Sequence, residues 1–334
     1  MKKKLLSALL CAAMVASLVI GCGSKEEPAA EAPAATEDAE VSAEEVEEAE
    51  DEENYETGDA SLDNTRNQDE IGENELLVVS FGTSFNDNSR LTIGAIEEKI
   101  EAAFPEYAVR RGFTSQIIID HVMSRDNVKI DNVAEALDRA VANGVKNLVV
   151  QPTLLMNGIE YEELTTTLAE YSDSFESVTV GEPLLTSDED FQKVATAIVD
   201  ATAEYDDGKT AIVFMGHGTH HESNAVYAKM QTVLTEGGHK NYFVGTVEGS
   251  PMLEEVMPLV EAGGYERVVL RPLMIVAGDH ANNDMAGLEE AGAWAYEFEA
   301  AGYEVVSVVE GLGQIEAIQD LLVEHTKAAV DSAK

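Results

Sequence analysis

Hydrophobic residues in this chain fall into short runs that alternate with longer stretches of helical spacing. The short runs are rich in branched side chains, which is typical of strands buried on both faces of a parallel sheet. They predict strands at 76–81, 107–112, 148–152, 177–180, 211–216, 242–247, 268–276 and 304–309. The stretches between them predict helices at 88–103, 114–123, 132–143, 161–171, 188–205, 224–234, 252–261, 288–300 and 314–330.

The second half of this pattern repeats the first. The segment VSFGT at 79–83 matches MGHGT at 215–219, and VVQPTL at 149–154 matches LRPL at 270–273. In each copy a glycine, Gly158 or Gly278, follows six residues after the proline. The pattern predicts an α/β fold with two similar doubly wound domains, each with a parallel sheet, related by internal duplication. We expect domains at 75–207 and 208–334, with an interdomain cleft as the ligand site.

The region before the first strand has a different composition. Residues 1–22 combine three lysines at 2–4, an apolar run at 5–20 and a glycine before Cys22, which resembles a bacterial lipoprotein signal peptide. Cys22 would then carry the lipid; the alternative is an ordinary export signal with an incidental cysteine. Residues 23–74 have almost no large apolar side chain and predict a disordered acidic tether. The expected location is the outer face of the cytoplasmic membrane, or the periplasm if the cell has two membranes.

Charge and cysteine content narrow the classes of partner. The formal net charge is −43, which argues against nucleic acid and against an anionic membrane surface, so membrane contact is expected only through lipid on Cys22. The other cysteine, Cys11, lies in the signal, and the folded part then has neither disulfides nor thiolate metal ligands. The oligomeric state stays open, a homo-oligomer included.

Three predicted strand ends in the second half each carry a side chain that can bind a metal. These are His217, Glu248 and His280. Because parallel strand ends lie beside one another, the three can converge although they are far apart in sequence. Two imidazoles and a carboxylate suit a divalent first-row metal. A single histidine at a strand end is more often a hydrogen-bonded structural group, so spacing alone leaves both interpretations open.

Several segments resemble the anaerobic-type sirohydrochlorin cobaltochelatases, which are class II tetrapyrrole chelatases. In the second half these are MGHGTHH at 215–221, GTVEGSP at 245–251 and LMIVAGDHANNDM at 273–285. In the first half they are LLVVSFGTS at 76–84, FTS at 113–115 and NGIEYE at 157–162. The resemblance extends in order over residues 75–328.

The resemblance implies a reaction and roles for the three ligands. A divalent ion, cobalt(II) by preference with iron(II) or nickel(II) as alternatives, is inserted into a cyclic tetrapyrrole held in the cleft. The metal is a substrate, so no permanent cofactor is implied. His217 and His280 would bind the ion, Glu248 would act as ligand or proton acceptor, and His217 would be the base for the pyrrole N–H protons. A histidine accepts a proton near neutral pH, which fits that role.

The macrocycle carries carboxylates, which need hydrogen-bond donors. Candidates near the first-half strand ends are Thr83, Ser84, Arg90 and Arg111. One departure from the family concerns the loop at 291–295, where alanines flank Trp294 in place of the usual serine and lysine. Substrate contacts along this loop are therefore in doubt.

Two functions remain in competition. The first is an exported chelatase; the second is a surface lipoprotein of the same fold that binds haem, another tetrapyrrole or a metal ion without turnover. The second is suggested by location, because tetrapyrrole synthesis is usually cytoplasmic. A protein that only binds a divalent ion is a weaker third alternative, because a two-domain cleft exceeds what one ion requires.

Overall fold

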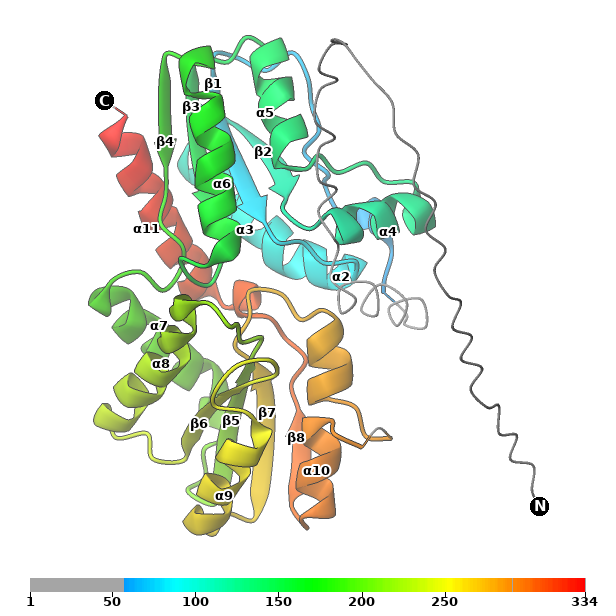
Figure 1. Ribbon diagram of the computed structural model, residues 1–334, viewed down its shortest axis with the longest axis vertical. Coiled ribbons are helices and arrows are strands. Elements are labelled where there is room, and N and C mark those ends of the chain that lie inside the picture. The colour runs from blue at the N-terminus through cyan, green and yellow to red at the C-terminus, as the bar shows by residue number, and fades with distance from the viewer. Residues whose placement is uncertain (1–56, 290, 334) are drawn as a thin grey trace, which may run out of the picture. The chain divides into compact units, whose positions relative to one another are not determined.

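Two parallel sheets with the same strand order organise the protein. The computed structural model describes residues 57–289 and 291–333, and in these residues each sheet has four strands (Figure 1). The first sheet has the order β2-β1-β3-β4, with β1 (Asn74–Ser80), β2 (Ala108–Phe113), β3 (Asn147–Pro152) and β4 (Ser177–Val180). The second has the order β6-β5-β7-β8, with β5 (Thr210–Gly216), β6 (Tyr242–Thr246), β7 (Arg267–Pro272) and β8 (Glu304–Ser307). The expected α/β duplication is confirmed.

Helices connect the strands in both copies. Those of the first copy are α2 (Asn86–Ser89), η3 (Arg90–Gly94), α3 (Ala95–Ala103), α4 (Gln116–Asp126), α5 (Val133–Ala142), α6 (Ile159–Glu170) and α7 (Asp188–Thr202). Those of the second are α8 (Ala225–Glu236), α9 (Leu253–Gly263), η7 (Ala281–Met285), α10 (Trp294–Ala300) and α11 (Glu316–Ser332). Short 3-10 turns complete the described chain: η2 (Ala60–Leu62), η4 (Ser172–Ser174), η5 (Ala203–Tyr205), η6 (Glu222–Asn224) and η8 (Leu312–Gln314). Residues 86–103 form one helical stretch with a π-type turn in its middle.

Alternate residues of the central strands pack on opposite faces of each sheet. In β1, Leu76 and Val78 join one core while Leu77 and Val79 join another with α5 and α6. In β5, Phe214 packs toward α8, and Met215 packs with residues of α9 and α10. This period of two on both faces explains why the strand sequences are continuously apolar.

The two copies are not closed units. Helix α7 belongs to the first copy in sequence but packs against α8, whereas α11, the last helix, packs against α3, β3 and β4 of the first sheet (Figure 1). The core between them contains Leu76 of β1 and Ile212 of β5 together with Leu322 of α11. The two halves therefore share one hydrophobic core, and the predicted division at 207/208 stays a prediction.

Three sequence expectations need correction. The run at 268–276 is not one strand, because Pro272 has no N–H for the ladder and β7 ends there. The helix expected from 288 begins only at Trp294, since Gly292 has a φ of +106°. The predicted tether, residues 23–74, extends too far toward the C-terminus, because Arg66 is only 2% exposed and forms an ion pair with Glu97.

The predicted signal peptide, Cys22 and the tether up to residue 56 lie outside the described residues. Within the described part of the chain, every helix is too short or too polar to span a bilayer.

Candidate active site

Three side chains from adjacent strand ends converge in the second half. His217 directly follows β5, Glu248 follows β6 and His280 lies beyond β7. One potential ligand atom from each lies within 4.8 Å of the other two. The imidazole rings of His217 and His280 meet edge to face, with centroids 4.6 Å apart. Ligand atoms bound at about 2.1 Å from one metal lie roughly 3–4 Å apart, so small side-chain rotations would complete such a site.

A backbone hydrogen bond joins the segment that follows β5 to the segment that follows β6 and holds His217 beside Glu248. The Glu248 amide N–H donates to the His217 carbonyl at 2.8 Å. Gly218 permits the two segments to approach this closely, because its φ is +90° and a Cβ there would lie 2.3 Å from the Gly249 nitrogen. The Gly218 N–H in turn donates to the buried Tyr227 hydroxyl at 3.2 Å. Burial raises the pKa of Tyr227 to about 12, which keeps this hydroxyl protonated at neutral pH.

His280 sits on a helical turn that the preceding loop delivers. Asn282 donates to the Gly278 carbonyl at 2.7 Å, and Asn283 donates to Asp279 at 2.5 Å. These bonds stabilise the turn that follows Gly278. The loop is also fixed from the first half, since the Ala277 N–H donates to Asn88 Oδ1 at 2.8 Å.

Both histidines have their Nδ1 atom engaged. His217 Nδ1–H donates to the Gly218 carbonyl at 2.8 Å, and His280 Nδ1–H donates to Asp284 Oδ2 at 2.7 Å. In each ring Nε2 then carries the lone pair that can bind a cation. The His217 side chain is 44% exposed and that of His280 only 15%. Glu248 Oε2 lies 3.8 Å from His217 Nδ1.

The four predicted substrate-binding residues are placed differently. Arg111 is 1% exposed, and its guanidinium donates to Glu97 and Asp63 at 2.7 Å each. Its side chain is therefore not accessible to a substrate. The expectation for Arg111 is therefore not supported, and its role is to fix the buried charges of the first half. Such pairing is what a buried guanidinium requires.

Of the other three candidates, Thr83 lies close to the second half. The Thr83 hydroxyl lies 3.3 Å from the position that a Cβ on Gly278 would take, and it accepts from the Phe85 N–H at 3.2 Å. Ser84 is fully buried, whereas the side chain of Arg90 is 37% exposed beside Asp87. Of the four, only Arg90 presents a charge to solvent.

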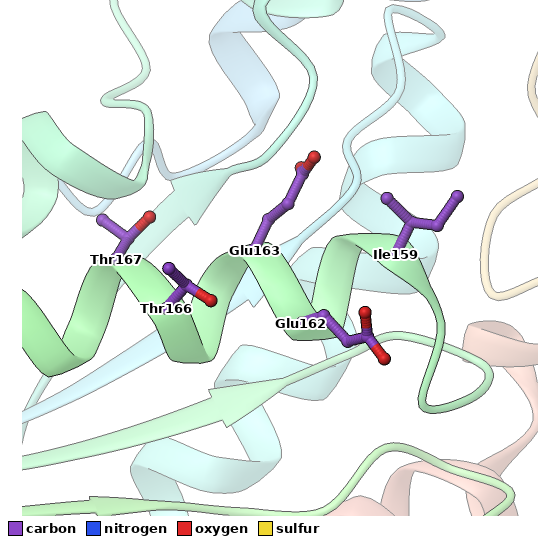
Figure 2. A pocket seen from close by; sticks show the side chains of 5 residues that line it. All are labelled: Ile159, Glu162, Glu163, Thr166 and Thr167. Atoms are coloured by element: carbon purple, nitrogen blue, oxygen red, sulfur yellow. The ribbon is translucent and has the colours of Figure 1, made fainter.

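The described residues form at least two surface hollows. One, of about 520 Å³, is lined by α6 alone; its residues are Ile159, Glu162, Glu163, Thr166 and Thr167 (Figure 2). The other, of about 330 Å³, touches the candidate site, because Asp284 and Val247 line it together with Trp294, Met252 and Met257. All residues that line this second hollow come from the second half.

The altered loop at 291–295 leads into the core. Trp294 is 3% exposed and packs closely on Gly245 of β6, and Ala295 is fully buried. Trp294 is thus a packing residue.

Sequence reasoning missed two contributors. Asp284 stands four residues after His280, a spacing that puts both on one helical face and could have identified it. No sequence signal pairs Asn88 with Ala277, because the contact joins positions 189 residues apart.

Fold and site together define a duplicated α/β protein with a candidate metal site at one sheet edge. The sequence matches the family described as "Cobalt chelatase (CbiK)" over residues 74–331. It is 35% identical to the sirohydrochlorin cobaltochelatase of Salmonella typhimurium over 77% of this chain and 97% of that protein. It is 30% identical to the sirohydrochlorin cobaltochelatase CbiKC of Nitratidesulfovibrio vulgaris over 77% of this chain and 90% of that protein.

The chain belongs to the cobalt chelatase (CbiK) family. Its fold is also similar to the solved structure of SirB from Bacillus subtilis with Fe³⁺, with a TM-score of 0.51 and 15% identity. That likeness covers 78% of this chain and 97% of SirB.

Proposed function

We propose that the protein is a sirohydrochlorin cobaltochelatase, which inserts cobalt(II) into sirohydrochlorin or a related tetrapyrrole. The observation that carries this proposal is the convergence of His217, Glu248 and His280 at adjacent strand ends. Two curated relatives that align over nearly their whole length are named for this activity. Iron(II) and nickel(II) remain alternative substrates, because the same nitrogen and oxygen donors accept them.

The exposures of the ligands support a division of roles. His280 is the more buried histidine and holds the ion, together with Glu248. His217 is the more exposed and is the base that takes a pyrrole N–H proton as a metal–nitrogen bond forms. Insertion releases two protons in all, and the Glu248 carboxylate beside His217 is the acceptor for the second.

Contacts to the macrocycle would come from the opposite half. Arg90 is the candidate for a substrate carboxylate, since it is charged and partly exposed at the end of α2. Thr83 lies close to Gly278 and can line the space in which the macrocycle would bind. Phe81 and Leu91, which are 38% and 41% exposed, add apolar surface near these residues for the ring faces.

We also propose that the enzyme is exported and anchored by lipid on Cys22. The support is the sequence alone, with its basic start, apolar run and glycine before the cysteine. Lipid on Cys22 would bring the catalytic part to a membrane without a spanning helix.

The experiment is insertion of cobalt(II) into sirohydrochlorin, followed by the change in absorbance, with the full-length protein and with His217→Ala. We expect turnover by the parent and a loss of about 100-fold or more in kcat for the variant, as for removal of a general base. Insertion no faster than the uncatalysed background, together with tight haem binding, would replace this proposal with that of a binding lipoprotein.

A further inference from the structure

The two histidines of the candidate site differ in what accepts their Nδ1–H. His217 donates to a neutral acceptor, the backbone carbonyl of Gly218. His280 donates to a carboxylate, Asp284 Oδ2, at 2.7 Å, one helical turn further along η7. A carboxylate behind an imidazole fixes the tautomer and the ring direction and makes the opposite nitrogen a stronger donor to a metal.

We propose that Asp284 is a positioning residue for metal capture. It holds His280 with Nε2 directed to the ion and strengthens that nitrogen as a ligand. The carboxylate itself stays outside the ligand set and acts through the ring. This inference rests on the proposed role of His280 as a metal ligand.

The same turn contains a matched structural contact. Asp279 and Asn283 have the same spacing as His280 and Asp284 and are joined by a side-chain hydrogen bond of 2.5 Å. If Asp284 only stabilised the turn, losing either contact would have the same effect. A positioning role predicts that only the loss of Asp284 changes metal binding.

Truncation at Asp284 is compatible with folding. Its side chain is 43% exposed, and it lines the hollow of about 330 Å³, so its removal leaves no buried cavity. The buried part of the turn, Ala281 and Met285, stays unchanged.

The chain also supplies its own reporter. Trp294 is the one tryptophan in the sequence, and it lines the same hollow as Asp284. A paramagnetic cobalt(II) ion bound at His280 would therefore quench its fluorescence. This gives a measure of metal binding that does not depend on turnover.

The experiment titrates cobalt(II) into the full-length protein, its Asp284→Ala and Asp284→Asn variants, and the control Asp279→Ala. We expect Asp284→Ala to weaken cobalt binding by about 10- to 100-fold, the usual cost of losing such a partner. Asp284→Asn keeps an acceptor oxygen without the charge, so its affinity should fall between those of the parent and Asp284→Ala. Asp279→Ala should bind like the parent.

Kinetics give a second measurement. The KM for cobalt(II) should rise in Asp284→Ala in proportion to the loss of affinity, while the KM for sirohydrochlorin stays unchanged. Parental cobalt affinity in Asp284→Ala, or an equal loss in Asp279→Ala, would overturn the inference.

Failure of the inference and failure of the proposed function have different signatures. If the parent inserts cobalt and His280→Ala loses cobalt affinity while Asp284→Ala does not, only the role of Asp284 is wrong. If Asp284→Ala weakens cobalt binding but the parent shows no insertion, the role of Asp284 stands and the chelatase proposal is wrong.

Discussion

At the scale of single residues, the candidate metal site depends on three side chains of the second half. His217, Glu248 and His280 each follow a predicted strand of one parallel sheet, and the order β6-β5-β7 makes those strands neighbours. Their convergence could thus be predicted from hydrophobic pattern and topology. Arg111 could not be excluded in the same way, because its partner Asp63 lies in a segment expected to be part of the tether.

Another buried charge, Glu75 of β1, leads to a prediction about pH. Glu75 is fully buried, and burial raises the pKa of its carboxyl to about 7, opposed by the charge of Arg110. A folded-state pKa above the unfolded value makes the contribution of this group to stability largest below about pH 4.5. The contribution is lost as pH rises through about 7, and the loss is on the order of 3 kcal/mol.

Glu75→Gln should therefore be more stable relative to the parent at pH 8 than at pH 5, by on the order of 3 kcal/mol. Urea unfolding of both proteins at the two pH values measures this difference. Glu73→Gln is the control, since this nearby glutamate is exposed. A stability difference between Glu75→Gln and the parent that does not change with pH would contradict the raised pKa of the buried Glu75 carboxyl.

At the scale of elements, most helices and strands begin and end within a few residues of the expected positions. Helix α5 shows why, because Asn132 and Glu135 form a capping box that the sequence reveals directly. The misplaced start of α10 has a local cause in Gly292, and the end of β7 has one in Pro272. The sequence of α11 does not indicate where this helix packs, because an amphipathic pattern does not specify which sheet the apolar face covers.

The packing of α11 predicts how the two sheets unfold. Leu322 is fully buried in a core that contains residues of both β1 and β5. Leu322→Ala should cost about 2–5 kcal/mol and lower amide hydrogen-exchange protection in both sheets together. Lys327→Ala, on the exposed face of the same helix, should change stability by less than about 0.5 kcal/mol. Loss of protection confined to one sheet would instead show that α11 stabilises only that half.

At the scale of the whole molecule, we predict that a lipidation signal precedes the α/β fold. Full-length protein expressed in a bacterial host should carry lipid on Cys22 and partition with membranes. Cys22→Ala should abolish lipid labelling and leave the catalytic part unchanged, because the described residues 57–289 and 291–333 are all distant in sequence from it. Cys11→Ala is the matched control, since that cysteine lies within the predicted signal and should leave labelling intact.

The hydrogen bond from the Ala277 N–H to Asn88 has a mechanical consequence. It ties the loop that carries His280 to the helical stretch at 86–103 of the opposite half. A hinge rotation that widened the space between the halves would have to stretch this bond or pull His280 away from His217 and Glu248. If His280 binds the ion as proposed, admission of a large ring through such a rotation would also weaken the binding of the ion.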